Sequence, residues 1–304
     1  MGRGYSAFVL GNSFQVPLAD ESVHCAITEP RFWTLRPHTR AYDDRHLGNE
    51  LSANTYLQRL VAIMREVKRV LRSDGVLWLF ADDSYGGPID RFPADRVPTP
   101  QFVGNRLLIP QRLALALQDD DWIVRQILIW ANTAVERESY PGWRLLENGE
   151  LRRGSWRRTN AHKYIFMLTK QMQYWADSTK DDLTSVLYVS TQPYRLPPFE
   201  QDIPTEIITP LIEATCPEWC CPVCGQGWAP RVDSRDYGRT CDHPHTQAEA
   251  VSGIVLDPFV GTGTTVMAAK QLHRRAVGVD LNPAYLRHAN QQLRLTHGTV
   301  FDGD

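Results

Sequence analysis

A glycine-rich turn followed by an acidic residue is the first chemical signal in the chain. Residues 255–265 read V-L-D-P-F-V-G-T-G-T-T, an apolar run entering a turn and then a helix. Gly261 and Gly263 allow close approach of a ligand to the backbone, and the helix N-terminus offers unpaired N–H groups. Asp280 ends the next apolar run, where a carboxylate can accept hydrogen bonds from ribose hydroxyls. This spacing predicts a nucleoside-binding crevice; a purely structural turn is the alternative, and a Walker A loop is excluded because no Gly-Lys-Ser/Thr follows.

The cysteines form a second group. Five of the six fall between Cys216 and Cys241, whereas a secreted disulfide scaffold spreads its cysteines along a short chain. A C-x-x-C pair followed by C-x-H can bind one zinc ion tetrahedrally, and a thiolate-rich set leaves no open position for water. We therefore expect a structural zinc site in a reducing compartment, with a metal-free loop as the alternative. The expected ligands are Cys221, Cys224, Cys241 and His243, with Cys216, Cys220 and His245 as substitutes.

A basic stretch between residues 144 and 163 is the candidate contact for a polyanion. It holds six Lys and Arg residues against two Glu residues. The net charge of the whole chain is -2, so any basic surface must be local. Arginines here can hold phosphates and a tryptophan can stack or wedge, while an ordinary solvated loop is the alternative. The residues expected to make these phosphate and stacking contacts are Arg152, Arg153, Trp156, Arg157 and Arg158.

Apolar periodicity predicts the elements that position these groups. The 304 residues are 42% hydrophobic and 22% charged, which suits one large α/β domain, and no stretch is long enough for a membrane span. Helices alternating with strands indicate an open, mostly parallel, Rossmann-like sheet with helices on both faces. The segments 132–160 and 216–245 interrupt the pattern. We expect strands at 7–10, 23–27, 76–81, 122–130, 162–169, 254–257 and 276–279, and helices at 54–71, 107–117, 264–272 and 283–295.

Several motifs resemble those of DNA methyltransferases that modify exocyclic amino groups. D-P-F-x-G-T-G-T-T followed by G-V-D-L-N-P looks like their S-adenosylmethionine motif. T-E-P-R-F-W-T-L-R at residues 28–36 resembles the T-S-P-P-Y-W-G-L-R of one branch, and A-H-K-Y-I-F-M-L-T-K at 161–170 resembles S-H-E-Y-I-F-L-L-T-K. Asp83-Ser84-Tyr85 resembles part of G-D-S-Y. The similarity covers nearly the whole chain, and the catalytic motif precedes the cofactor motif, as in the β group.

The resemblance implies roles for the cofactor residues. Phe259 is expected beside the adenine ring and Asp280 at the ribose. Asp257 and the backbone of 261–263 are expected at the amino-acid portion, and Asn12 in a loop near the adenine. The segment 191–204 is implied as a further wall. The implied cofactor set is Asn12, Asp257, Pro258, Phe259, Gly261, Gly263, Thr264, Thr265, Asp280 and Asn282.

The resemblance also implies methyl transfer to an amino nitrogen of a DNA base, with cytosine N4 favoured over adenine N6. Such an amino group is a poor nucleophile because its lone pair is delocalised into the ring. In the family a Ser, Asp or Asn side chain and a proline-pair carbonyl accept its N–H groups, and an aromatic ring stacks on the flipped base. Here Glu29 and Pro30 take those places, Phe32 supplies the stacking ring and Trp33 a second wall. Core packing of the two rings is the alternative.

Arg31 departs from the family motif, because it replaces the second proline. A cation at about 5 Å from a sulfonium costs about 3 kcal/mol at an effective dielectric constant of about 20. Three interpretations stay open. In the first, Arg31 points outward to a DNA phosphate or pairs with Glu29, and methyl transfer proceeds. In the second, Arg31 binds the carboxylate of a carboxylated S-adenosylmethionine, and a carboxymethyl group is transferred. In the third, the protein is an inactive DNA-binding pseudoenzyme.

The expected organisation is one methyltransferase domain over residues 1–304. Its parts are a catalytic half at 1–131, a DNA-recognition segment at 132–160, a cysteine-rich insert at 216–245 and a cofactor-binding half at 246–304. The expected setting is the cytoplasm, with DNA as partner and no membrane. A homodimer and a restriction endonuclease partner are left open.

Overall fold

The fold is built on one large sheet. The computed structural model describes residues 5–33, 46–48, 50, 52–85, 104–132, 143–154, 158, 160–180, 184–190, 203–230 and 237–295. The strands of this sheet are β1 (Ser6–Leu10), β2 (Val23–Thr28), β3 (Leu71–Ala81), β4 (Ile123–Ala131), β7 (His162–Thr169), β8 (Val186–Tyr188), β11 (Ile254–Asp257) and β12 (Arg275–Asp280).

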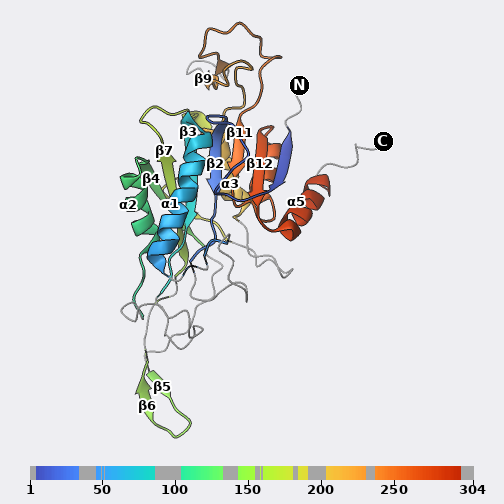
Figure 1. Ribbon diagram of the computed structural model, residues 1–304. Helices are drawn as coiled ribbons and strands as arrows, with labels where there is room; N and C mark the ends of the chain where they lie inside the picture. Colours follow the sequence, from blue (N-terminus) through green and yellow to red (C-terminus); the bar gives the residue numbers. More distant parts are fainter. Residues whose placement is uncertain are drawn as a thin grey trace.

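The strand order is β1-β12-β11-β2-β3-β7-β4-β8 (Figure 1). Each neighbouring pair is parallel except those of β7, which is antiparallel to both β3 and β4. The carboxyl ends of β1, β12, β11, β2 and β3 therefore lie along one edge of the sheet, which is where open α/β sheets bind ligands. The expected α/β, mostly parallel architecture is confirmed.

Helices cover both faces of the sheet. They are α1 (Ala53–Val70), α2 (Ile109–Asp119), α3 (Thr205–Thr215), α4 (Thr264–Gln271) and α5 (Pro283–Leu295), with a 3-10 turn, η3, at Ser178–Lys180. Two short hairpins stand apart from the sheet: β5 (Trp143–Leu145) with β6 (Leu151–Arg153), and β9 (Ala229–Pro230) with β10 (Tyr237–Gly238). None of the helices in the described part of the chain is long and apolar enough to cross a membrane.

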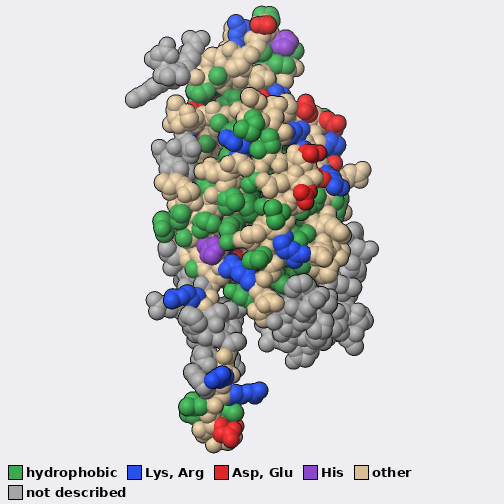
Figure 2. Space-filling view, turned by 90° about the vertical axis from the view of Figure 1, so that its left-hand side faces the viewer, with side chains coloured by type: hydrophobic (Ala, Val, Ile, Leu, Met, Phe, Trp, Pro, Cys, Tyr) green, Lys and Arg blue, Asp and Glu red, His purple; other side chains and the backbone are tan. Residues whose placement is uncertain are grey.

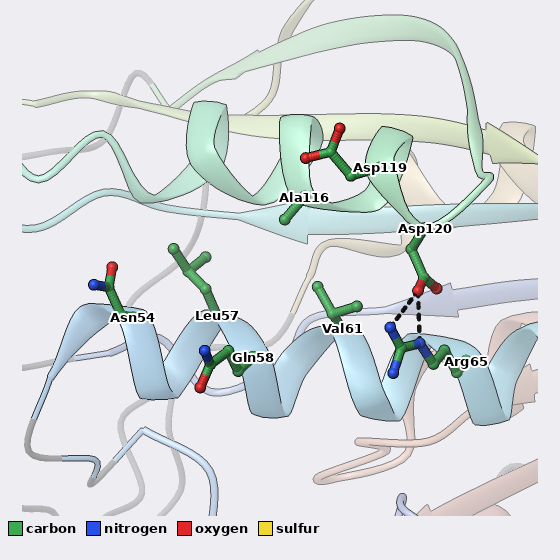
Figure 3. Close-up of a pocket in the computed structure, with 8 residues that line it drawn as sticks. All are labelled: Asn54, Leu57, Gln58, Val61, Arg65, Ala116, Asp119 and Asp120. Atoms are coloured by element: carbon green, nitrogen blue, oxygen red, sulfur yellow. Dashed lines mark hydrogen bonds and ion pairs between the residues drawn. The ribbon is translucent and has the colours of Figure 1, made fainter.

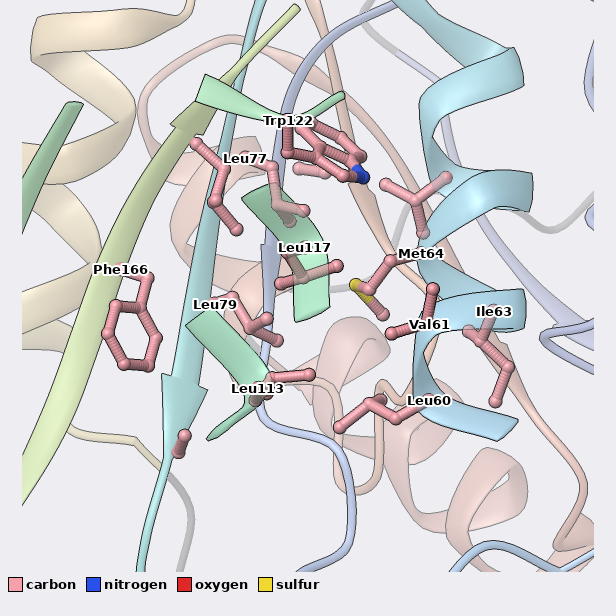
Figure 4. Close-up of a cluster of buried hydrophobic side chains, with 14 of the residues drawn as sticks. Leu60, Val61, Ile63, Met64, Leu77, Leu79, Leu113, Leu117, Trp122 and Phe166 are labelled. Carbon is pink, nitrogen blue, oxygen red and sulfur yellow. The ribbon is translucent and has the colours of Figure 1, made fainter. Parts of the chain in front are cut away.

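Alternation along β3 divides the core into two layers. Successive strand residues point to opposite faces, so Leu77 and Leu79 join one buried cluster and Trp78 and Phe80 the other. The first cluster packs β3 against α1 and α2 (Figure 4). The second packs it against α3 and α4. The helix α1 forms here because its apolar residues recur at three- and four-residue spacing and because Ser52 caps its first turn by accepting the N–H of Thr55.

Several elements differ from the sequence expectations. The strand β3 already begins at Leu71, because Leu71 pairs with Val23 while the turn-like residues 72–75 form an irregularity before the pairing resumes at Val76. The short edge strand β8 and the helix α3 were not expected. The sequence of α3 is rich in β-branched residues and contains Pro210, which disfavour helix, yet burial of its apolar residues stabilises it. The β5–β6 hairpin lies in the segment expected to be irregular.

A groove of about 400 Å³ lies between α1 and α2 (Figure 3). The Arg65 guanidinium forms an ion pair of 2.6 Å with Asp120 in its wall. Its lining residues are Asn54, Leu57, Gln58, Val61, Arg65, Ala116, Asp119 and Asp120. None of these belongs to the sites expected from the sequence, so the groove is separate from the chemistry described next.

Candidate cofactor and catalytic site

The catalytic and cofactor motifs of the sequence meet at the carboxyl edge of the sheet. The last residues of β2 and β11, Thr28 and Asp257, are joined by a hydrogen bond of 2.9 Å from the threonine hydroxyl to the carboxylate. Asp280 ends β12 and pairs in register with Leu10, the last residue of β1. Segments more than two hundred residues apart in the chain are thus brought together by the order of the strands.

Asp280 is held as a hydrogen-bond acceptor at this carboxyl edge of the sheet, where the sequence predicts the crevice. Its Oδ2 accepts the backbone N–H of Gly261 at 3.1 Å, and its Oδ1 accepts that of Asn282 at 2.7 Å. Burial raises the pKa of Asp280, while the nearby charges of Arg31 and His46 act in the opposite direction. A carboxylate has about four acceptor positions, so capacity is left for ribose hydroxyls. This residue fits the nucleoside part of S-adenosylmethionine.

Asp257 is a buried support of the loop. Its side chain accepts bonds from Thr28, from the backbone N–H of Phe259 at 3.0 Å and from Thr265. Burial raises the pKa of Asp257 to about 7, and these three hydrogen bonds oppose that rise. The residue is only 4% exposed, and its carboxylate is already bound by these groups of the protein. A contact between Asp257 and the cofactor stays a prediction.

The glycines of the turn serve the backbone and the packing. Gly263 has φ +96°, a left-handed conformation that favours glycine, and a Cβ atom there would lie 2.9 Å from both Ala289 and Phe8. Glycine is therefore required at position 263 by its close packing against α5 and β1. The sequence predicts another reason, the close approach of a ligand. Gly261 has φ +49° and offers its N–H to Asp280.

Other residues expected at the cofactor mostly order the rim of the crevice. The Asn12 amide oxygen accepts the N–H of Phe14 at 3.1 Å, directly after β1. The amide oxygen of Asn282 accepts the N–H of Ala284 and so caps α5. Sequence reasoning missed Ser13, whose hydroxyl donates to the Pro258 carbonyl at 2.6 Å and ties the two loops together.

The catalytic segment holds a charge pair that the sequence analysis did not expect. The Lys163 ammonium, on β7, lies 2.6 Å from the Glu29 carboxylate. It also lies 4.9 Å from the centre of the Phe32 ring and 5.1 Å from that of Trp130. From the sequence, Lys163 belongs to the basic stretch. The available signal was the motif itself, because Lys163 stands where the similar motif S-H-E-Y has a glutamate.

Trp33 corrects one expectation, because it is a core residue. It is 5% exposed, and its indole N–H donates to the Glu50 carbonyl at 2.8 Å. A ring so buried offers no face to a base, so the second aromatic wall expected at Trp33 is wrong. The segment before it is anchored, since the Tyr56 hydroxyl donates to the Arg31 carbonyl at 3.1 Å. Ser84 donates to the carbonyl of Trp33 at 2.7 Å.

The cysteine-rich segment brings its four expected ligands together. The ligand atoms of Cys221, Cys224, Cys241 and His243 all lie within 4.8 Å of one another. The substitutes do not join this group among the described residues: Cys220 contacts His24 at 3.4 Å. Three sulfurs and one imidazole are the donor set of a structural zinc site, so the residues fit this metal.

This segment docks at the amino end of the strands, opposite the crevice. His24, at the start of β2, is buried, and its Nε2 donates to the Gly225 carbonyl at 2.8 Å while its Nδ1 accepts the N–H of Ile254. Burial lowers the pKa of His24 to about 4, which keeps it neutral. Arg72 donates to the Cys224 carbonyl at 3.1 Å. Figure 1 shows β9 and the β5–β6 hairpin at opposite ends of the molecule.

The residues expected to contact DNA are only partly described. Arg152 and Arg153 are exposed on β6, and Arg158 is exposed as well. Figure 2 shows Lys and Arg side chains on the hairpin that projects from the body. The backbone of Arg152 pairs in register with that of Arg144. Trp156, Arg157 and most of 191–204 lie outside the described residues.

An open parallel sheet with one antiparallel strand, and with a glycine turn and an acid at adjacent strand ends, defines a methyltransferase-type α/β fold. Two solved structures share it. The PvuII DNA methyltransferase (cytosine-N4-specific) matches with a TM-score of 0.60 and 14% identity, over 95% of this chain and 88% of that one. A DNA modification methylase from Thermus thermophilus, complexed with S-adenosyl-L-methionine, matches with a TM-score of 0.57 and 20% identity, over 95% and 93%.

Sequence comparison identifies the family. The model of the N6/N4 DNA methylase family matches residues 23–291. Type II methyltransferase M.Cfr9I of Citrobacter freundii is 31% identical over 91% of this chain and 83% of its own length. M.SmaI of Serratia marcescens is 30% identical over 91% and 86%. The chain belongs to the N6/N4 DNA methylase family and is a site-specific DNA methyltransferase, as the motifs indicated.

Proposed function

We propose that this protein methylates the exocyclic amino group of a DNA base, cytosine N4 in preference to adenine N6. The observation that carries the proposal is the hydrogen bond between Thr28 and Asp257, which sets the segment bearing Glu29 beside the glycine loop. The Gly261 N–H of this loop binds Asp280. A fold relative described as cytosine-N4-specific supports the preference for cytosine. In this proposal the chain is one domain with the four parts expected from its sequence.

The residues divide the work between holding the donor and preparing the acceptor. S-adenosylmethionine, when bound, supplies a methyl group on a sulfonium. Asp280 holds ribose hydroxyls, and Phe259 packs beside the adenine. Glu29 accepts an N–H of the target amino group, which directs the nitrogen lone pair away from the ring, and then takes the proton that the nitrogen loses as its new bond to carbon forms. Alignment of the two reactants supplies much of the acceleration.

Mass spectrometry of nucleosides tests this proposal. DNA from cells that express the protein, in a host without its own amino-methyltransferases, should contain N4-methyldeoxycytidine. Detection of N6-methyldeoxyadenosine instead would support methylation of an amino group and would overturn the preference for cytosine. The absence of any modified nucleoside, together with retained duplex binding, would overturn the proposal in favour of a pseudoenzyme.

A second candidate reaction is transfer of a carboxymethyl group. Arg31 lies on the loop after β2, beside Gly48, where a Cβ atom would approach the Arg31 Cγ to 3.2 Å. The positive charge of Arg31 opposes the rise in the pKa of Asp280 that burial causes, so a cation lies within electrostatic reach of the residue proposed to hold the cofactor. A carboxylated S-adenosylmethionine would offer it a carboxylate, and charge-assisted pairs of this kind are strong. The amino nitrogen would displace the sulfur at the carboxymethyl carbon, and the proton would again pass to Glu29.

Arg31→Pro discriminates between the two donors. If Arg31 binds a carboxylate, the proline variant should lose roughly 10-fold or more in its preference for the carboxylated donor, because a hydrogen bond to a charged group is removed. Nucleosides formed from equimolar mixtures of both donors give the product ratio. Arg65→Ala, in the separate groove, is the matched control. Equal ratios in parent and proline variant would refute charge matching.

We also propose that Cys221, Cys224, Cys241 and His243 hold a structural zinc ion. The support is the convergence of four soft or borderline ligands within 4.8 Å and the placement of their segment at the amino end of the sheet. Zinc there would fix the turn whose Cys224 and Gly225 carbonyls accept bonds from Arg72 and His24.

Cys224→Ser should reduce bound zinc from one equivalent to near zero and lower Tm by about 5–15 °C, because loss of a structural metal costs several kcal/mol. Elemental analysis and thermal unfolding measure the two effects. His245→Asn changes a histidine of the same segment outside the ligand group and should keep its zinc. A protein purified in zinc-containing medium that held no metal and was unaffected by chelators would contradict the site.

The β5–β6 hairpin is proposed as a DNA phosphate contact. Replacing Arg152 and Arg153 together by alanine should weaken binding to duplexes of any sequence and flatten the dependence of log K on log salt by about 2, since each phosphate contact contributes about 0.9. Fluorescence anisotropy over a salt series gives this slope. Arg65→Ala is again the control, and an unchanged slope in the double variant would exclude the hairpin from the interface.

Since the similar curated proteins are Type II methyltransferases, we propose that the modification protects sites of a companion restriction endonuclease. Resistance of the modified DNA to endonucleases that share its recognition sequence would support this. Sedimentation of the protein in solution decides whether a second copy of the chain takes part.

A further inference from the structure

The Glu29–Lys163 pair places a hydrogen-bond acceptor directly beside a donor. The two groups are 2.6 Å apart, and their side chains are 16% and 26% exposed, respectively. Glu29 follows β2 and Lys163 lies on β7, so they reach the same point from two strands on either side of β3. The similar motifs carry serine at the position of Glu29 and glutamate at the position of Lys163. In this chain the carboxylate therefore follows β2 instead of lying on β7, and the β7 position holds a cation.

The ammonium is held in place by aromatic rings. Lys163 Nζ lies within 5.1 Å of the ring centres of both Phe32 and Trp130, which is within the range of cation–π attraction. Trp130 is itself fixed, since its indole N–H donates to the Val189 carbonyl at 2.9 Å. One face of Phe32 is therefore covered by Lys163, and a base that stacks on Phe32 uses the other face or displaces the ammonium.

The chemistry of the target base matches this arrangement. Cytosine N4 adjoins the ring acceptor N3, and adenine N6 adjoins the ring acceptor N1. A lysine ammonium has three N–H donors, so one can bind Glu29 while another points to a base. In the same pose, thymine and guanine present a carbonyl oxygen to the carboxylate and an N–H to the ammonium, and both contacts are repulsive.

We propose that Lys163 donates a hydrogen bond to the ring nitrogen next to the target amino group, so that Glu29 and Lys163 together read the Watson–Crick edge of the flipped base. The inference rests on the proposed methylation and names the residue that selects its substrate. It makes Lys163 a specificity-determining residue rather than part of a basic patch for phosphates.

A thermodynamic cycle that combines one side-chain change with the change of one atom in the substrate tests the role of Lys163. Duplexes carry either the target base or its analogue without the ring nitrogen, 3-deazacytosine for cytosine or 1-deazaadenine for adenine. Affinity without a methyl donor and single-turnover methylation are measured for the parent and for Lys163→Met. The parent should lose roughly 10- to 100-fold on the analogue in both measurements, whereas Lys163→Met should treat the two duplexes alike.

Lys170→Met is the matched control, because Lys170 also forms an ion pair, with Glu21 at 3.5 Å, outside the crevice. This variant should discriminate between the duplexes as the parent does. An equal loss on the analogue for the parent and for Lys163→Met would overturn the inference while methylation persists. Absence of methylation in the parent itself would instead overturn the proposed function.

Discussion

Replacing Glu29 by glutamine should slow methyl transfer by about 10²–10⁴-fold, the range for loss of a group that takes a proton in the reaction. The amide still fills the space after β2, and its oxygen can accept one N–H. It cannot take the proton, and it leaves the Lys163 ammonium without the carboxylate that now lies 2.6 Å away. The expected defect is therefore in the chemical step.

Single-turnover kinetics with enzyme in excess measure that step, and binding of S-adenosylhomocysteine and of the duplex should stay within a few-fold of the parent. Glu21→Gln is the control, because Glu21 is also a lysine-paired glutamate but lies away from the crevice. If Glu29→Gln methylated DNA at the parent rate, Glu29 would not be the proton acceptor, and the Pro30 backbone carbonyl would be left to hold the amino group.

The strands, and the edge of the sheet at which the two motifs meet, were predictable because their signals are local. Apolar runs bounded by turns gave β2, β7, β11 and β12 nearly to the residue. The parallel architecture then placed the carboxyl ends of β2, β11 and β12 at one edge. The convergence of Cys221, Cys224, Cys241 and His243 was likewise predictable, since a C-x-x-C turn and a C-x-H pair need only one closure of the chain to meet.

What could not be predicted depends on contacts between distant strands. Lys163 meets Glu29 only because β7 runs antiparallel beside β3, and nothing in the local sequence of β7 indicates its neighbour. Trp33 carries an aromatic ring suited either to stacking or to packing, and only the three-dimensional position of Glu50 decides for packing. The helix α3 is stabilised by its surroundings against its own propensity.

Asp280→Ala should weaken binding of S-adenosylmethionine and S-adenosylhomocysteine by roughly 10- to 100-fold, because hydrogen bonds to a charged acceptor are lost. The same change releases the N–H groups of Gly261 and Asn282 from their carboxylate, so the glycine turn loses its anchor to β12 as well. Both effects act on the cofactor side of the crevice, and the affinity for duplex DNA should change little.

Calorimetric titration with S-adenosylhomocysteine separates these effects from catalysis, because this ligand carries no transferable group. Asp20→Asn is the control, since Asp20 pairs with Arg69 outside the crevice and should bind the ligand as the parent does. A parent-like affinity in Asp280→Ala would place the ribose elsewhere. Glu29 and Asp280 lie at the ends of β2 and β12, on either side of β11, so a ribose held at Asp280 keeps the methyl donor near Glu29. If the ribose bound elsewhere, the donor would have to approach the amino group from another position.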